Sequence, residues 1–139
     1  MGKPDLGPLH AHALRLTPGT DLRVELESRT RALALKAGCI LTCVGSLRPA
    51  RLRLAGGEQV LELPGPLEIV SLVGTLSPDG VHLHVSVADG DGVVRGGHLL
   101  AGSLIHTTAE IVLGELVGVT FSRAVDAATG WRELEIRPG

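Results

Sequence analysis

Residues 81–87 alternate strictly between apolar and polar side chains, and no other stretch of the sequence constrains the fold as strongly. Because successive side chains of a β-strand point to opposite faces, this pattern predicts a strand with one buried face and one polar face. This strand lies between two turn sequences, Ser77-Pro78-Asp79-Gly80 before it and Asp89-Gly90-Asp91-Gly92 after it. The buried face would carry Val81, Leu83, Val85 and Val87, and the polar face His82, His84 and Ser86.

Comparable short segments between glycine and proline turns fill most of the chain. The predicted strands are residues 10–16, 39–47, 51–54, 59–63, 67–76, 81–87, 93–100, 104–113, 118–124 and 131–136. Apolar residues lie on both faces of residues 67–76, which predicts a central strand covered on two sides. Residues 21–36 are rich in helix formers, with Leu22, Leu26 and Leu33 along one face and Gly38 as a stop.

This order of elements predicts the α+β class. We expect a sandwich-like domain in which one main helix packs on a mainly antiparallel β-sheet. The chain of 139 residues suits a single domain, residues 1–139, with its core over about residues 10–136.

The three histidines of residues 82–98 are the strongest candidate for chemistry. Residues i and i+2 of a strand point the same way, about 7 Å apart along it, so His82 and His84 could close on one ion. The turn at residues 89–92 could fold His98 back beside them as a third ligand. Three histidines with an open fourth position form the ligand set of a catalytic zinc site. The alternative is three ordinary polar residues at a solvent-exposed or inter-subunit surface.

A second polar row lies on residues 104–113, where His106, Thr108 and Glu110 share one face. Glu110 could be a fourth ligand, a partner that orients a ligand histidine, or a general base. In an enzyme, Glu110 or His106 would carry the proton. The alternative is the exposed polar face of a half-buried strand.

The charge balance weighs against nucleic acid held by bulk charge. There are 13 basic and 15 acidic residues, a net charge of −2, and only 1% aromatic residues to stack on bases. Arg48, Arg51 and Arg53 form the only basic cluster, with Arg51 and Arg53 on one strand face. They are a weak candidate for contact with nucleic acid or another anion, and the alternative is a charged edge strand that resists aggregation.

The sequence shows no apolar run of membrane-spanning length and no signal peptide. Its two cysteines, Cys39 and Cys43, lie in an apolar stretch and are expected to be reduced and buried. We therefore expect a cytoplasmic protein with no membrane association.

Several ordered blocks of the sequence resemble the PPC (plants and prokaryotes conserved) domain family. These blocks are Ala13–Leu22 (ALRLTPGTDL), residues 37–47 (AGCILTCVGSL), residues 67–76 (LEIVSLVGTL), His82-Leu83-His84, Gly96-Gly97-His98-Leu99 and Thr107-Thr108-Ala109-Glu110-Ile111. The resemblance runs from about His12 to Ala124 and is closest to the stand-alone prokaryotic type, which keeps the His-x-His and Gly-Gly-His residues.

The resemblance implies a mainly antiparallel α/β domain that assembles as a homotrimer. In plant relatives an AT-hook precedes the domain and binds DNA, and no such hook occurs in this sequence, so DNA is a weakly supported partner. We therefore expect a trimeric binding or regulatory module of the DNA-binding class, with a metal site at His82, His84 and His98 and zinc as the ion. The alternative is a zinc-dependent enzyme at the same site, which we favour less because nothing in the sequence names a substrate.

Overall fold

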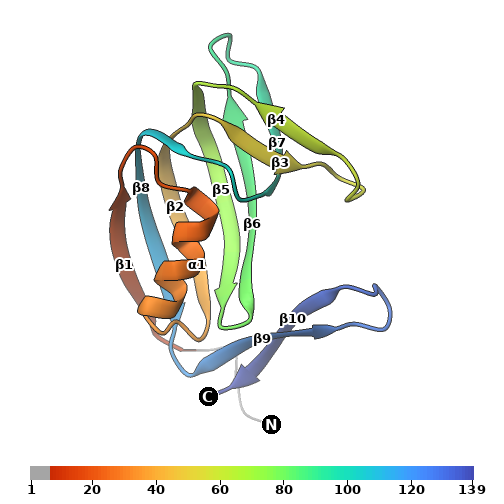
Figure 1. Ribbon diagram of the computed structural model, residues 1–139. Coiled ribbons are helices and arrows are strands. Elements are labelled where there is room, and N and C mark those ends of the chain that lie inside the picture. Colours follow the sequence, from red (N-terminus) through yellow and green to blue (C-terminus); the bar gives the residue numbers. More distant parts are fainter. Residues whose placement is uncertain (1–6) are drawn as a thin grey trace.

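The computed structural model describes residues 7–139, which form one α-helix and ten β-strands (Figure 1). The elements in chain order are β1 (Leu9–Leu16), α1 (Leu22–Ala32), β2 (Gly38–Leu47), β3 (Ala50–Arg53), β4 (Val60–Leu63), β5 (Leu67–Ser77), β6 (Gly80–Ala88), β7 (Val94–Leu99), β8 (Ile105–Leu116), β9 (Val119–Val125) and β10 (Arg132–Pro138).

Eight of these strands form one antiparallel sheet in the order β1-β8-β2-β5-β6-β7-β3-β4. The hairpin of β9 and β10 is a separate two-stranded sheet that projects from the body below β6 (Figure 1). The predicted architecture, a mainly antiparallel sheet with a single helix, is confirmed.

The helix is shorter than the sequence pattern suggests. Asp21 caps its start by accepting a hydrogen bond from the Val24 backbone N–H at 3.1 Å. The helix ends at Ala32 because Ala34 takes a left-handed backbone conformation, φ +52°. The predicted extension to residue 36 is therefore wrong, and Leu33, which was expected on one face with Leu22 and Leu26, is 37% exposed. Beyond this reversal the chain buries Leu35 instead.

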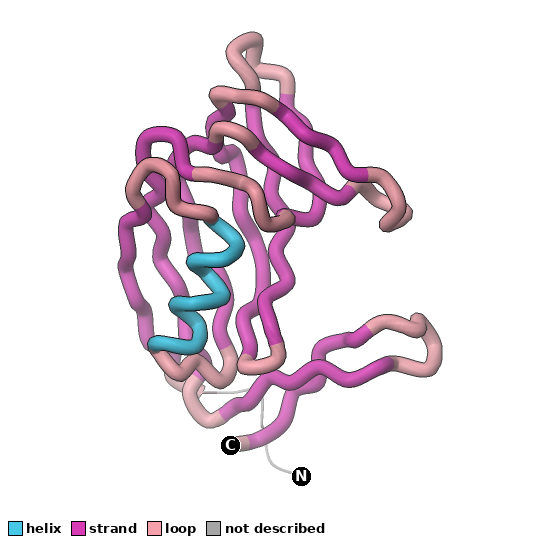
Figure 2. The backbone as a smooth tube through the Cα atoms, viewed as in Figure 1, coloured by secondary structure: helices cyan, strands magenta, loops and turns pink. Residues whose placement is uncertain are grey.

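Only one face of the sheet carries the helix (Figure 2). Leu22 and Leu26 of α1 are fully buried and belong to the same core as Leu72 of β5 and Leu83 of β6. On the other face, side chains of the central strands β2 and β5 are exposed: Val44 at 58%, Val70 at 55% and Val73 at 54%. Within this chain β5 is thus covered on one face, and residues 7–139 do not supply the predicted cover of its second face.

Cys39 and Cys43 are free thiols that are half-buried, less enclosed than expected. Desolvation raises the pKa of Cys43 to about 11, so this thiol is protonated at neutral pH. The part of the chain that the structure describes holds no helix with the length and apolar character of a membrane span.

Candidate metal centre

Strands β6 and β7 bring three histidines to one point of the sheet. His84 of β6 lies directly opposite His98 of β7, and His82 precedes His84 by two residues on the same face. The turn between the strands is held by Asp89, whose Oδ1 accepts hydrogen bonds from the backbone N–H groups of Asp91 and Val93 at 2.9 and 3.0 Å. The predicted return of His98 beside His82 and His84 is confirmed.

The spacing of the three side chains suits a metal ion. One ring nitrogen of each lies within 4.8 Å of the others, and the ring centroids are 4.9 to 5.8 Å apart. Two nitrogens bound to one zinc ion at about 2.0–2.1 Å are at most about 4.2 Å apart, so small side-chain rotations would close the set. His82, His84 and His98 could therefore hold a metal ion.

The environment keeps two of these imidazoles neutral. Burial, followed by the charges of Arg53 and Arg23, lowers the pKa of His98 to about 4. Burial and the neighbouring His84 and Arg123 also lower the pKa of His82. Neutral imidazole is the form that binds metals, so protons compete little with an ion at neutral pH.

The hydrogen bonding of His98 leaves one ring nitrogen without a partner in the described chain. Its Nδ1 is buried and has no hydrogen-bond partner among residues 7–139, whereas its Nε2 lies 3.5 Å from Nη1 of Arg23. A buried nitrogen without a partner is costly in a folded protein. A metal ion bound at Nδ1 would satisfy this nitrogen and leave the ring proton on Nε2, and three imidazoles are a donor set that fits an ion such as zinc.

Stability of the metal-free protein should depend on pH through His98. Its pKa is about 4 in the folded chain and about 6.5 in the unfolded chain, so the unfolded chain takes up a proton first as the pH falls. We expect the free energy of unfolding to decrease between about pH 6.5 and 4. Urea denaturation at several pH values in this range measures the free energy of unfolding. His98→Gln should flatten the pH dependence, and an equally steep profile in that variant would contradict the assignment.

Two glycines allow the strands to come close around the histidines. A Cβ on Gly74 of β5 would lie only 2.2 Å from the carbonyl oxygen of His82, and one on Gly97 of β7 only 2.7 Å from that of Arg53. Both contacts are with backbone and cannot be relieved by moving a flexible side chain. Glycine at these positions thus sets the positions of the strands that carry His82 and His98.

The other predicted proton carriers lie elsewhere on the sheet. Glu110 and His106 are exposed on β8, and β2 and β5 separate β8 from β6. Three strand spacings amount to roughly 14 Å, so the structure does not bring these residues to the histidines of their own chain. Their roles stay predictions that now require a neighbouring subunit.

The basic cluster is divided by the fold. Arg51 and Arg53 share a face of β3, as expected. Arg51 is paired with Glu62 of β4 at 3.2 Å, whereas Arg53 lies opposite His98. Arg48 is exposed ahead of β3. Of the three, only Arg53 is near the candidate metal centre.

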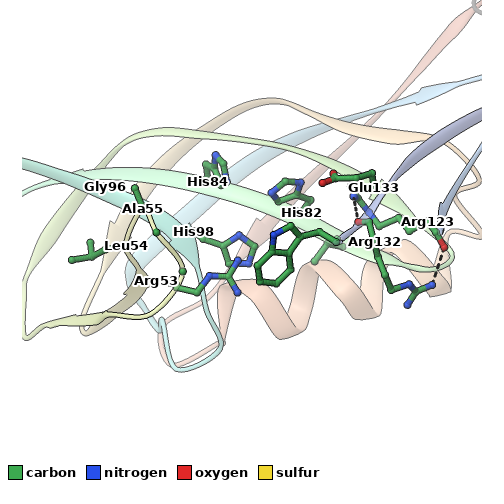
Figure 3. A pocket seen from close by; sticks show the side chains of 15 residues that line it. Arg53, Leu54, Ala55, His82, His84, Gly96, His98, Arg123, Arg132 and Glu133 are labelled. Carbon is green, nitrogen blue, oxygen red and sulfur yellow. Dashed lines mark hydrogen bonds between the residues drawn. The ribbon is translucent and has the colours of Figure 1, made fainter. Parts of the chain in front are cut away.

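A cavity of about 880 Å³ opens beside the histidines (Figure 3). One side is formed by β6, β7 and the turn that follows Arg53 in β3, and the other by the hairpin of β9 and β10. The hairpin contributes Arg123, Trp131, Arg132 and Glu133. Sequence reasoning missed these four, because they are 25 to 51 positions from the histidines in the chain. The single Trp was the one signal that could have pointed to them.

This chain is similar to known proteins over most of its length. Two curated relatives, each a bifunctional protein GlmU from a Synechococcus strain, are 52% identical over 130 and 132 residues, or 94% and 95% of this chain. The chain spans about a fifth of their length, 21% in each case.

Solved structures reproduce the whole fold. A hypothetical protein from Salmonella cholerae-suis is 41% identical with a TM-score of 0.93, covering 96% of both chains. The metal-containing protein AF0104 from Archaeoglobus fulgidus is 31% identical with a TM-score of 0.78, covering 91% of this chain and 93% of its own. A plant- and prokaryote-conserved (PPC) protein from Pyrococcus horikoshii is 27% identical with a TM-score of 0.75, covering 94% and 96%.

Two further structures, from Bacteroides thetaiotaomicron and Ralstonia eutropha, are named as candidate DNA-binding proteins. Each is 20% identical to this chain, with TM-scores of 0.79 and 0.76 and about nine-tenths of both chains covered. At that identity the likeness shows the fold alone. A sequence model of the Plants and Prokaryotes Conserved (PCC) domain, the family abbreviated PPC above, matches residues 5–117. This match covers most of the chain, and the chain therefore belongs to the Plants and Prokaryotes Conserved domain family.

Proposed function

We propose that this chain is a zinc-binding member of the family that assembles as a homotrimer and acts as a binding or regulatory module in the cytoplasm. The observation that carries the proposal is the cluster of His82, His84 and His98, whose ligand nitrogens lie within 4.8 Å of one another. Support also comes from the metal-containing relative of Archaeoglobus fulgidus, which has the same fold.

Zinc fits this donor set better than harder cations do. Imidazole nitrogen is a preferred zinc ligand, whereas magnesium and calcium require oxygen ligands. The test is elemental analysis of protein purified without a histidine tag and then titrated with zinc by calorimetry. About one zinc ion per chain is expected, and protein that neither retains nor takes up zinc would overturn the proposal.

The homotrimer is supported by the open face of the sheet. Val44, Val70 and Val73 are more than half exposed on β2 and β5, in the middle of the large sheet. Exposed apolar patches on central strands mark interaction surfaces. A second and third copy of this chain would cover the face that the single helix leaves open.

Sedimentation tests the assembly directly. At micromolar concentration we expect a particle of three times the 14.4 kDa chain mass. Val44→Asp should dissociate it, because an aspartate in an apolar interface would lose its hydration. Val60→Asp is the matched control, since Val60 is a similarly exposed valine on the edge strand β4. A monomeric mass for the unaltered protein would contradict the proposed trimer.

A zinc-dependent enzyme is the second candidate, favoured by the cavity on the open side of the histidines. When bound, zinc would supply a Lewis acid or a water of lowered pKa. Within this chain, Glu133 is the carboxylate that lines the cavity, whereas Glu110 and His106 lie across the sheet. Zinc-dependent turnover of a simple ester or phosphodiester that is lost in His84→Ala would support this second candidate.

DNA is the partner suggested by the names of the two distant structures. The basic residues that would contact it are divided, since Arg51 is paired with Glu62 and Arg53 lies opposite His98. With so few free positive charges on β3, any DNA affinity should be weak and should decrease steeply with added salt. The geometry at Arg53 favours a smaller anion.

A further inference from the structure

We propose that the cavity beside the three histidines binds a small oxyanion, a molecule carrying a carboxylate or phosphate group, between Arg53 on one side and Arg123 and Arg132 on the other. The inference deepens the proposed function and rests on it in one respect, because the anion would face the open side of the metal site. The arginine contacts themselves need no metal.

The charges that line the cavity are unbalanced. Arg53, Arg123 and Arg132 line it, and Glu133 is the one carboxylate among its lining residues. Among residues 7–139, these three arginines have no carboxylate within ion-pair distance, whereas Arg23, Arg29, Arg51 and Arg137 each do. A concave surface with surplus charge of one sign concentrates ligands of the opposite sign. The lining of the cavity therefore carries a surplus of positive charge.

Glu133 offsets part of this surplus at the end of the cavity beside His82, on which its charge acts. Its Oε1 accepts a hydrogen bond from the Thr129 hydroxyl at 3.0 Å, within the loop that joins β9 to β10. Figure 3 shows it beside His82, at the opposite end of the cavity from Arg53. An ion held by three neutral imidazoles would keep its full double charge and add to the attraction for an anion.

The two arginines of the hairpin are held in place before any ligand arrives. Nη2 of Arg123 donates to Oγ1 of Thr75 on β5 at 3.0 Å, and its Nη1 donates to the backbone carbonyl of Arg132 at 3.4 Å. Nη2 of Arg132 donates in return to the carbonyl of Arg123 at 3.0 Å. Guanidinium groups held in this way lose little freedom on binding, which favours affinity for an oxyanion.

One hydrogen-bond donor of this pair has no partner. Nε of Arg123 is buried and makes no hydrogen bond to any of residues 7–139. Arg53 lies opposite His98 in the pairing of β3 with β7 and lines the cavity beside it (Figure 3). A carboxylate or phosphate in the cavity would meet the guanidinium of Arg53, whereas the buried Nε of Arg123 becomes a further donor only when that side chain turns toward the ligand.

The hairpin lies outside the part of the chain that defines the family. The family model ends at residue 117, and β9 begins at Val119. The histidines and Arg53 therefore belong to the matched domain, whereas Arg123 and Arg132 belong to the hairpin that follows it. We infer that the hairpin adds the anion-binding side of the cavity to a metal site built by the domain.

Fluorescence of Trp131 tests the proposal, because it is the only Trp and it lines the cavity. The probes are inorganic phosphate and acetate, titrated at constant ionic strength into zinc-loaded protein and into metal-free protein from which the chelator has been dialysed away. We expect a saturable change with at least one anion, and the anion with the lower Kd identifies the group. No saturable change with either anion in either form would overturn the proposal.

Arg53→Gln and Arg132→Gln should each raise the Kd about tenfold or more, since each removes a charge-assisted contact. Arg137→Gln is the matched control, because Arg137 lies on the same hairpin, is paired with Glu135 at 2.7 Å and does not line the cavity. An unchanged Kd in both cavity variants would overturn the proposal. Arginine-dependent anion binding by protein that takes up no zinc would leave this inference standing while removing the proposed zinc site.

Discussion

Replacing His84 by alanine is expected to lower the affinity for zinc by at least about a hundredfold, since loss of a residue that merely orients a metal ligand already costs about 10–100-fold. His84 is central to the cluster, directly opposite His98 and two residues from His82. Without His84, only two imidazoles remain as ligands. Water would then have to fill two of the four positions of a tetrahedral zinc ion.

Calorimetric titration of zinc into the metal-free variant measures this loss. His10→Ala is the matched control, because His10 is exposed on β1 at the far edge of the sheet. The control should bind zinc as the unaltered protein does. Zinc binding that survives in His84→Ala, or that falls equally in His10→Ala, would show that the ion binds elsewhere.

Leu83→Ala is expected to affect stability instead of zinc affinity. It should lower the free energy of unfolding by about 2–5 kcal/mol. Leu83 lies between His82 and His84 in sequence, but its side chain points to the other face of β6 and is fully buried under the helix. Removing three of its carbons leaves a cavity among packed neighbours, which the rest of the core cannot fill without moving.

Urea denaturation of the metal-free protein, at one protein concentration for all variants, measures this effect. Val24→Ala is the control, because Val24 is a half-exposed valine on α1 whose truncation should change stability by no more than about 0.5 kcal/mol. A Leu83→Ala variant as stable as the Val24→Ala control would contradict the assignment of the core face. Substitutions of the neighbouring residues Leu83 and His84 thus separate effects on stability from effects on zinc binding.

The sequence pattern is sufficient to assign the histidines to one face of β6 and Leu83 to the other, because this assignment depends only on neighbouring residues. Alternation over residues 81–87 fixes which side chains share a face, whatever the strand packs against. The turn at residues 89–92 is equally local, since Asp89 bonds residues only two and four positions away. Together these local features are sufficient to predict the three-histidine cluster without knowledge of the strand order.

The end of the helix and the cover of the sheet were not local in this sense. Leu33 continues the apolar spacing of α1, yet the chain reverses at Ala34 so that Leu35 reaches the core. Val70 and Val73 are as apolar as core residues, yet they are exposed on the side of β5 that the helix does not cover. Hydrophobic character alone does not show which layer of a fold covers a side chain.

The strands, the antiparallel class, the family and the three histidines on one polar face could all be predicted from the amino-acid pattern. The surroundings of these histidines depend on tertiary packing. It separated Glu110 and His106 from the cluster by two intervening strands, moved Arg53 beside His98, and brought Arg123, Trp131 and Arg132 to the cavity from a distant hairpin. The physical reason is that strand periodicity is set by neighbouring residues, whereas strand order and hairpin placement depend on packing between segments far apart in the chain.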